Sequence, residues 1–446
     1  MGAPAGCPWD LIVRRVAILI AGLLASHTAT SADTASLAAE ARSILGANQG
    51  VYIESTNGTP LLSQEAQKAV HPASVSKVPT TLALLRKLGP DYRFATTFSA
   101  RGTLSEGTLH GDLLVESNGD PAFVDENALL VADRLRELGV TQVTGQLRLR
   151  GNMTFDWQDD EDGLKLQRAL AGSVSPAALA AVRAFELENP TGPTPEKLLP
   201  TGIRFLGAAE LTPTSNPTPA SNAAPTSSAT PASAAPTSSV TPASMLVRPL
   251  LVHRSQPLLP LAKSLNDYSN NIFKPLADAA GGAAAVEAVA RSAVPGSMQS
   301  EIKLGDGAGT DPANRLSPRA AVKLLRALEE ELKKSGHGLT DILPVCGIDD
   351  GTLRRRLDGP DEVGRVVGKT GTYGDYGASA LVGAIPTSDR GTVYFAILNH
   401  GVPVPEARRR QDRFVRALLQ HLASVPWNYQ RDIRPAIARA EVTAPN

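Results

Sequence analysis

Ser74 and Lys77 form a pair whose residue types and spacing could support nucleophilic catalysis. A serine hydroxyl is a poor nucleophile unless a neighbouring base takes its proton, and an unprotonated lysine amine can be that base. Side chains three residues apart lie on the same face of a helix. Apolar residues at helical spacing, followed by Gly89-Pro90, predict a helix over 75–88. The pair therefore predicts a serine that is activated by a lysine on its own helix.

The same residues also have ordinary structural interpretations. Serine is a favoured helix N-cap, and an isolated lysine is usually solvated. A second Ser-x-x-Lys pair occurs at Ser300 and Lys303, before the turn-rich residues 305–309. Because no helix is predicted after it, and because both residue types are common, we interpret this second pair as chance.

Two further polar clusters follow Ser74 in the chain. Lys369-Thr-Gly-Thr372 comes after an apolar pair, which is typical of an edge strand where glycine lets a ligand backbone approach. Ser269-Asn-Asn271 lies in a short polar interval between helical stretches, and Ser264-Leu-Asn266 is an alternative match to the same pattern. The order S-x-x-K, S-x-N, K-T-G is the motif set of serine acyl-transfer enzymes, the β-lactamases and penicillin-binding proteins.

With these motifs, the chain resembles the D-alanyl-D-alanine carboxypeptidase/endopeptidase family of low-molecular-mass penicillin-binding proteins. The resemblance is to the class C type, which has a large insertion between the first two motifs, whereas class A β-lactamases place the second motif much sooner. It covers most of the chain after residue 32. It is carried by HPASVSKVPTTLALLRKLG, GDLLVESNGDPAF, VTQVTGQLRL, DYSNNIF, LPVCGIDDGTLRRRL and GKTGTYGDYG.

The resemblance implies a role for each motif residue. Ser74 would attack the carbonyl of the terminal D-Ala-D-Ala bond and become acylated, with Lys77 as its base. Ser269 would pass a proton towards the leaving D-alanine, and Asn271 would hold the substrate amide. Lys369, Thr370 and Thr372 would bind the terminal carboxylate of the substrate, and Gly371 of the same strand would also belong to the substrate-binding site.

The implied mechanism makes two demands on the surroundings of the nucleophile. An ordinary lysine, with a pKa of about 10.4, is protonated at neutral pH, so Lys77 needs a pocket that lowers its pKa. Lys369 would help to supply the positive field. The developing oxyanion would be held by the backbone N–H groups of Ser74 and Thr372.

The chain of 446 residues is long enough for two or three domains. We predict an α/β fold: a serine β-lactamase/DD-peptidase-like core, with an antiparallel sheet flanked by helices, and a mixed α/β insertion domain. A stretch without charged or aromatic residues is predicted to be disordered, because it cannot bury enough apolar surface to fold. The expected divisions are signal peptide 1–32, core 33–95 and 246–427, insertion 96–211, Thr/Pro/Ser/Ala-rich spacer 212–245 and C-terminal tail 428–446.

The first residues are interpreted as a secretory signal. Arg14 and Arg15 precede the apolar run 16–25, and small residues follow, so that we place cleavage after Ala32. The alternative is a membrane anchor, but the run falls short of the roughly 20 residues that span a bilayer. The mature protein is expected to have no integral membrane segment and to act in the periplasm or cell envelope.

Composition excludes several other classes of function. Lys plus Arg and Asp plus Glu both total 44, so there is no excess positive charge for nucleic acid. Cys7 and Cys346 cannot build a disulfide framework, and the seven histidines lack metal-ligand spacing. We therefore expect no metal and no cofactor. The implied partners are peptidoglycan stem peptides, with β-lactam antibiotics as covalent inhibitors.

The predicted function is a peptidoglycan D-Ala-D-Ala carboxypeptidase with an acyl-serine intermediate, and DD-endopeptidase action is a further activity that the resemblance implies. The alternatives are a β-lactamase or esterase on the same core, and a non-catalytic cell-wall binding protein. Two departures from the family pattern stand out. Arg150-Gly151 occurs where relatives commonly have an aspartate near the substrate side chain, and the loop 306–309 lacks a serine.

Overall fold

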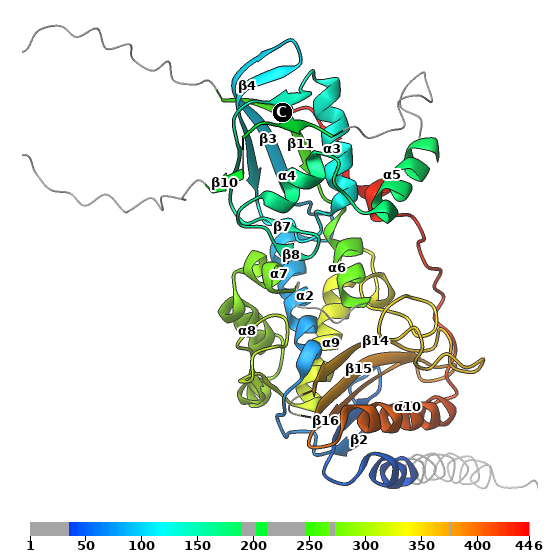
Figure 1. The fold of residues 1–446 in the computed structure, drawn as a ribbon. Helices are drawn as coiled ribbons and strands as arrows, with labels where there is room; N and C mark the ends of the chain where they lie inside the picture. The colour runs from blue at the N-terminus through cyan, green and yellow to red at the C-terminus, as the bar shows by residue number, and fades with distance from the viewer. Residues whose placement is uncertain are drawn as a thin grey trace, which may run out of the picture. The chain divides into compact units, whose positions relative to one another are not determined.

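The computed structural model of the chain describes residues 35–188, 202–207, 209–211, 247–267, 273–374 and 377–445. They form two compact units, each assembled from separate parts of the chain (Figure 1). Unit 1 comprises the chain up to Asp91 and Leu258–Asp432, and unit 2 comprises Tyr92–Pro257 and the residues from Ile433 onwards. The predicted signal peptide and the predicted spacer lie outside the described residues.

Unit 1 is built on an antiparallel sheet of five strands in the order β14-β15-β16-β1-β2. Strands from the two ends of the chain pair with each other at its centre, where β1 lies beside β16. The predicted antiparallel core sheet is thus confirmed. Its strands are β1 (Gly50–Glu54), β2 (Pro60–Gln64), β14 (Val367–Tyr373), β15 (Ala378–Pro386) and β16 (Thr392–Asn399).

Helices cover both faces of this sheet, which explains why its central strands are apolar throughout rather than alternating (Figure 1). Helix α10 (Val404–His421) and the helix over 35–45 pack on one face, in a core that includes Phe395 and Phe414. Helix α9 (Pro318–Lys333) packs on the other face. Its start is fixed by Ser317, whose side chain accepts a hydrogen bond from the backbone of Ala320.

Helix α2 (Lys77–Leu88) is the buried central helix of unit 1. Its first nine residues are all buried, so it has no solvent face there. It packs against α9 and against three shorter helices, and the turn η1 (Ala73–Ser76) leads directly into it. The shorter helices are α6 (Leu258–Asp267), α7 (Phe273–Ala280) and α8 (Ala283–Ser292).

Unit 2 contains an eight-stranded sheet with the main order β10-β6-β4-β3-β11-β17. Helix α3 (Asp125–Glu137) and helix α4 (Leu164–Leu170) bury apolar side chains in the core over this sheet, and α5 spans Pro176–Glu188. The strands are β3 (Ala95–Ser105), β4 (Thr108–Ser117), β5 (Gln142–Val143), β6 (Leu147–Arg150), β9 (Arg204–Phe205), β10 (Ala209–Leu211), β11 (Val247–Arg254) and β17 (Glu441–Thr443).

The boundaries between the units differ from those expected at residues 246 and 428. Strand β11 pairs with β3, so the chain returns to unit 1 only at Leu258. A bulge at Pro249 lets this strand contain a proline, which cannot donate to the ladder. Residues 441–443 pair with β11, which assigns the end of the tail to unit 2.

None of the helices in the described part of the chain combines the length and the apolar character needed to cross a bilayer.

Candidate active site

Ser74 and Lys77 meet at the junction between η1 and α2. The Nζ atom of Lys77 donates a hydrogen bond to the Oγ atom of Ser74 across 3.0 Å. Only 7% of Ser74 and 1% of Lys77 are exposed, so this lysine is not a solvated surface residue. The pair can therefore exchange a proton in a site that largely excludes water.

The backbone immediately before Ser74 is strained. Ala73 has a φ angle of 48°, in the left-handed region that costs an L-residue about 1–2 kcal/mol. Such residues persist where the surrounding structure fixes them, and they cluster at functional sites. Ala73 begins the helical turn η1, in which Ser74 is the second residue.

Two glycines allow other segments to pack against this strained turn. A Cβ atom on Gly371 in β14 would lie 2.5 Å from the carbonyl oxygen of Pro72 and 3.1 Å from the amide nitrogen of Ser74. A Cβ atom on Gly309 would lie 2.1 Å from the carbonyl oxygen of Ala73. Both distances to oxygen are too short for any side chain, so glycine is required at each position. The K-T-G strand is thereby brought against the nucleophile.

The loop that contains Gly309 also supplies a negative charge near Lys77. Burial alone would raise the pKa of Asp306, but hydrogen bonds from Thr310, Asn314 and the backbone bring that pKa below its ordinary value. The loop is tied to α2 because the Thr80 hydroxyl donates to the carbonyl of Gly307 across 2.8 Å. Asp306 is thus an anion that favours the protonated form of Lys77.

Both motif lysines have lowered pKa values. Burial lowers the pKa of Lys77 to about 8, against the opposing charge of Asp306. Burial, and then the charge of Lys77, lower the pKa of Lys369 well below its ordinary value, while Asp267 opposes the change. The charge of Lys77 thus disfavours a second positive charge on Lys369. With a pKa of about 8, about one tenth of the protein has an unprotonated amine next to Ser74 at pH 7.

We expect the rate of acylation by penicillin to rise with pH. The reactive form needs the neutral amine, so its population should increase about tenfold from about pH 6 to about pH 7 and level off above about pH 8. The second-order rate constant of acylation, measured over this range with a parallel unfolding curve at each pH, checks the expectation. A flat profile in a folded protein would show that Lys77 is not the base.

Strand β14 presents Lys369 and Thr370 from a buried position. The Lys369 amine donates to the carbonyl of Thr370 across 3.3 Å. The Thr370 hydroxyl lies 2.7 Å from the Thr352 hydroxyl, and the Thr352 amide donates to the carbonyl of Asp267 across 2.9 Å. This chain of contacts links the K-T-G strand to the end of α6, two residues before Ser269.

Asp267 is a site residue that sequence reasoning missed. Burial raises its pKa to about 7, and Lys263, Lys369 and Arg431 oppose the rise. The loop that carries Thr352 packs on the Asp267 backbone, because a Cβ atom on Gly351 would lie 1.9 Å from the Asp267 carbonyl oxygen. The left-handed φ of 89° at Gly351 also requires glycine.

Replacing Thr352 by valine is expected to lower the second-order acylation rate constant about tenfold. The change removes the hydroxyl that joins Thr370 to the end of α6, and one such hydrogen bond contributes about 0.5–1.5 kcal/mol. Thr352→Ser retains the hydroxyl and is the matched control. Equal rates for Thr352→Val and the wild type, at equal thermal stability, would exclude a positioning role.

The two possible S-x-N motifs differ in what the structure describes of them. Ser269 and Asn271 lie outside the described residues. The alternative Ser264 donates to the carbonyl of Leu261 across 2.8 Å. Asn266 is fully buried and donates to the carbonyl of Ile342, so both are engaged in the packing of α6.

The surroundings of the second Ser-x-x-Lys pair and of Cys346 differ from those of Ser74 and Lys77. Ser300 and Lys303 are exposed, in η3 (Gly296–Glu301) and β12 (Ile302–Lys303). Cys346 is buried, and burial raises the pKa of its thiol. No group of three or more His, Cys, Asp or Glu residues that could hold a metal occurs in the described part of the chain.

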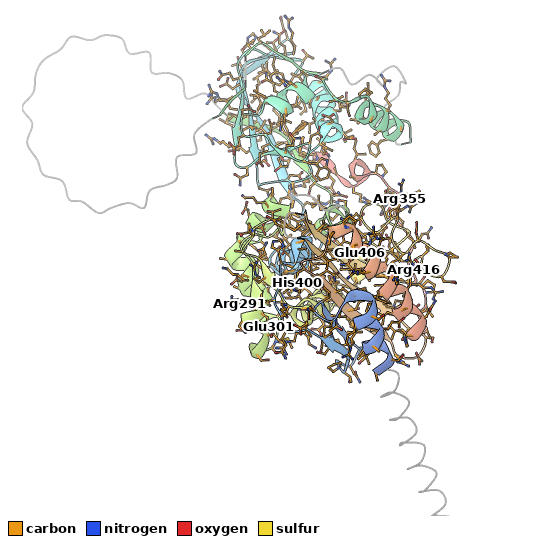
Figure 2. The ribbon with its side chains drawn as sticks, turned by 60° about the horizontal axis from the view of Figure 1, so that its bottom comes forward. Arg291, Glu301, Arg355, His400, Glu406 and Arg416 are labelled. Carbon is orange, nitrogen blue, oxygen red and sulfur yellow. The ribbon has the colours of Figure 1, made fainter. Side chains whose placement is uncertain are left out.

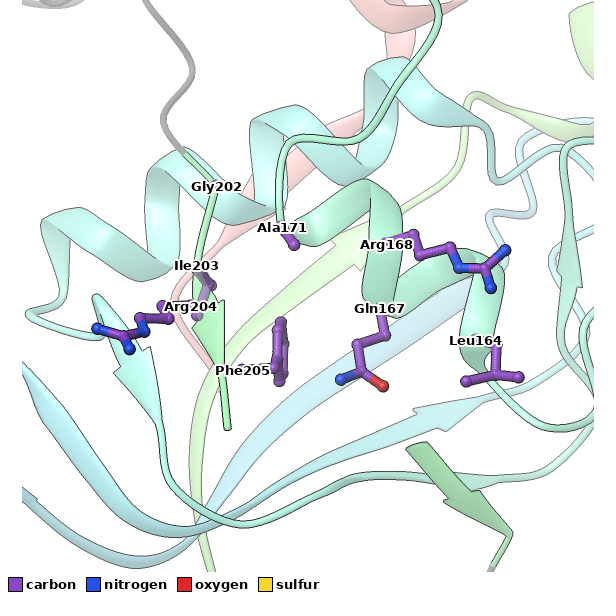
Figure 3. A pocket seen from close by; sticks show the side chains of 8 residues that line it. All are labelled: Leu164, Gln167, Arg168, Ala171, Gly202, Ile203, Arg204 and Phe205. Carbon is purple, nitrogen blue, oxygen red and sulfur yellow. The ribbon is translucent and has the colours of Figure 1, made fainter. Parts of the chain in front are cut away.

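Unit 2 contains a pocket of about 530 Å³ between α4 and β9 (Figure 3). In this pocket Gln167 lies opposite Phe205, and two arginines lie at its rim. None of the motif residues lines it. The lining residues are Leu164, Gln167, Arg168, Ala171, Gly202, Ile203, Arg204 and Phe205.

Residues 30–179 and 238–421 match the D-Ala-D-Ala carboxypeptidase 3 (S13) family. The chain belongs to this family. Membership confirms the predicted family and the predicted class of enzyme, a serine-type D-Ala-D-Ala carboxypeptidase. It favours this class over the β-lactamase, esterase and cell-wall binding alternatives. The second matched segment contains the S-x-N and K-T-G motifs.

Solved structures share the fold of this D-Ala-D-Ala carboxypeptidase 3 family member. The predatory endopeptidase Bd3459 of Bdellovibrio bacteriovorus, acylated by penicillin G and in complex with the immunity protein Bd3460, is 20% identical, with a TM-score of 0.68 over 89% of this chain and 99% of that chain. The predatory endopeptidase Bd0816 of the same organism is 24% identical, with a TM-score of 0.65 over 86% and 96%. Penicillin-binding protein 4 of Haemophilus influenzae is 19% identical, with a TM-score of 0.57 over 88% and 99%.

Proposed function

We propose that the protein cleaves the terminal D-Ala-D-Ala bond of peptidoglycan stem peptides, with Ser74 as the nucleophile and Lys77 as its base. The observation that carries this proposal is the 3.0 Å contact between the Lys77 amine and the Ser74 hydroxyl in a buried site. The lowered pKa of Lys77 supports the role of base, because burial disfavours its charged form.

In the proposed mechanism, the Ser74 hydroxyl attacks the carbonyl carbon and its proton passes to Lys77. The tetrahedral oxyanion is held by backbone N–H groups, of which the Ser74 amide is one, and the close approach of Gly371 brings β14 next to it. Collapse breaks the amide bond, and the D-alanine amine leaves with a proton relayed through Ser269. Water then attacks the acyl ester, and Ser74 recovers its proton.

The same nucleophile would open a β-lactam ring, because that ring is also an activated amide. The acyl group would then remain on Ser74, as in the penicillin G-acylated endopeptidase with a similar fold. Asn271, Lys369, Thr370, Gly371 and Thr372 complete the proposed substrate site. Peptidoglycan lies outside the cytoplasm, and this supports the proposed signal peptide over 1–32 and the proposed periplasmic or cell-envelope location.

The proposal assigns two activities, carboxypeptidase and endopeptidase, to one site. Purified protein is incubated with a defined pentapeptide muropeptide and with a cross-linked dimer, and the products are identified by mass spectrometry. Release of D-alanine from the monomer supports carboxypeptidase action, and conversion of the dimer to monomers supports endopeptidase action. If both substrates remain intact while the wild-type protein is folded, the proposed function is wrong.

A further inference from the structure

Arg408 of helix α10 lies beside Thr372, the last threonine of the K-T-G-T segment. We propose that Arg408 is a specificity-determining residue that binds, together with Thr372, the free carboxylate of the acyl donor. The inference rests on the proposed function, because it concerns the same acylation site. It adds a guanidinium from α10 to a substrate site otherwise assigned to the three sequence motifs.

The first observation is a direct hydrogen bond between α10 and β14. The Nη2 atom of Arg408 donates to the Oγ1 atom of Thr372 across 2.6 Å. Thr372 directly follows Gly371, whose close approach to the Ser74 amide defines the position of β14 at the nucleophile. A ligand that reaches Thr372 from the nucleophile therefore also comes within reach of the guanidinium.

The direction of this hydrogen bond leaves the threonine with a free donor. A hydroxyl has one O–H group to donate and two lone pairs that accept. Since Arg408 has no acceptor, the Thr372 oxygen must accept from it, and the Thr372 O–H group remains available for a ligand oxygen. Thr370 is engaged differently, because its hydroxyl contacts Thr352. Thr372 and Arg408 together present donors only, which is the chemistry that binds an anion.

The second observation is the charge balance along α10, of which Figure 2 labels Glu406 and Arg416. Most neighbouring arginines have a carboxylate partner. Among the residues that the structure describes, no carboxylate lies within ion-pair distance of Arg408, and Arg408 is exposed. The paired residues are Arg356 with Asp412, Arg409 and Arg410 with Glu406, and Arg416 with Glu362.

The surroundings of Arg408 also disfavour its charge while the site is empty. Burial and then the nearby Arg356 lower the pKa of Arg408, and Asp412 only partly opposes them. A bound anion would relieve this repulsion. Guanidinium groups bind carboxylates through two parallel hydrogen bonds, and such charge-assisted pairs are stronger than neutral ones. The ligand class is therefore an acyl donor with a carboxylate close to the bond that is cleaved.

The test compares two ligands that differ only in that carboxylate, penicillin G and its methyl ester. The variants are Arg408→Gln, Arg408→Lys and, as a control, Arg413→Gln, which changes an exposed arginine on the same helix. The second-order acylation rate constant is measured for each protein and ligand. A loss of one charge-assisted hydrogen-bonding partner corresponds to roughly a 10- to 100-fold change.

We expect Arg408→Gln to slow acylation by penicillin G by this factor and to change acylation by the ester less than about twofold. Arg408→Lys, which keeps the charge, should recover part of the rate, and it replaces the glutamine variant if that protein does not fold. Arg413→Gln should leave both rates unchanged. Equal losses with both ligands, or no loss with either, would overturn the role of Arg408. If the wild type reacts with neither ligand, the proposed function itself has failed.

Discussion

Lys77→Met should lower the second-order rate constant for acylation by penicillin by about 10³-fold while leaving the protein folded. The amine that lies 3.0 Å from the Ser74 hydroxyl would be absent, and methionine cannot accept the hydroxyl proton. Stopped-flow or gel-based measurement of labelling with a fluorescent penicillin checks the loss. Lys303→Met is the matched control, because this exposed lysine belongs to the second Ser-x-x-Lys pair and should be dispensable.

The same variant is expected to be more stable than the wild type at neutral pH. The pKa of Lys77 falls from 10.5 to about 8 on folding, so the folded protein binds fewer protons than the unfolded chain between these values. The penalty for burying this charge is fully present below pH 8 and disappears as the pH rises through 10.5. Methionine avoids the penalty, with an expected gain of about 3 kcal/mol.

Chemical unfolding at neutral pH and near the ordinary lysine pKa distinguishes this cause from a general packing effect. The gain in free energy of unfolding should be larger at neutral pH than at the alkaline pH. A Lys77→Met protein that is both inactive and less stable would indicate that Lys77 stabilises the folded site. It would contradict the interpretation of Lys77 as a base whose burial destabilises the protein.

Gly371→Ala is the second substitution with a large expected effect, about a 100-fold loss in acylation rate. Its new Cβ atom would lie 2.5 Å from the Pro72 carbonyl oxygen, so β14 must move away from the nucleophile turn. Because the obstructing atom belongs to the backbone, a change of side-chain rotamer cannot relieve the clash. Displacement of about 1 Å in a catalytic site is enough to cause a loss of this size.

Gly374→Ala provides the control for this prediction. A Cβ atom at Gly374 meets nothing within 4 Å, so alanine should be accommodated three residues further along the chain. Acylation rates and melting temperatures of both variants are compared with the wild type. Full activity in Gly371→Ala would mean that the close approach of β14 to Ser74 is not required for the reaction.

The local parts of the site could be predicted from the sequence because they depend on short-range geometry. The three-residue spacing places Lys77 beside Ser74 whatever the rest of the fold does. The apolar periodicity of residues 75–88 also predicted helix α2 correctly. The family resemblance, which the family match confirms, predicts that the three distant motifs serve one site.

For other elements, the sequence pattern did not predict the type of the element or its bounds. Strand β15 is buried on both faces and rich in alanine, so it shows neither alternation nor helical periodicity. Helix α10 begins at Val404, before its first run of apolar repeats, because Pro405 is tolerated in its first turn. The true start places Arg408 in the second turn of the helix, beside Thr372.

Contacts between distant segments could not be predicted from spacing at all. Thr352 belongs to a run that the family resemblance covered, but nothing in its neighbours indicates a contact with Thr370. Asp267 precedes the S-x-N motif, yet its burial and raised pKa arise from packing in three dimensions. The left-handed φ of Ala73 is likewise a property of the assembled turn, since alanine carries no sequence signal for it.

The most direct test of the account is to locate the covalent bond that the protein forms with penicillin G. Intact-mass spectrometry of the full chain should show one adduct of the antibiotic's mass, and peptide mapping should place it on the peptide that contains Ser74. Ser74→Ala should show no adduct while its thermal unfolding matches that of the wild type. An adduct on another serine, or persistent labelling of Ser74→Ala, would contradict the assignment of the nucleophile.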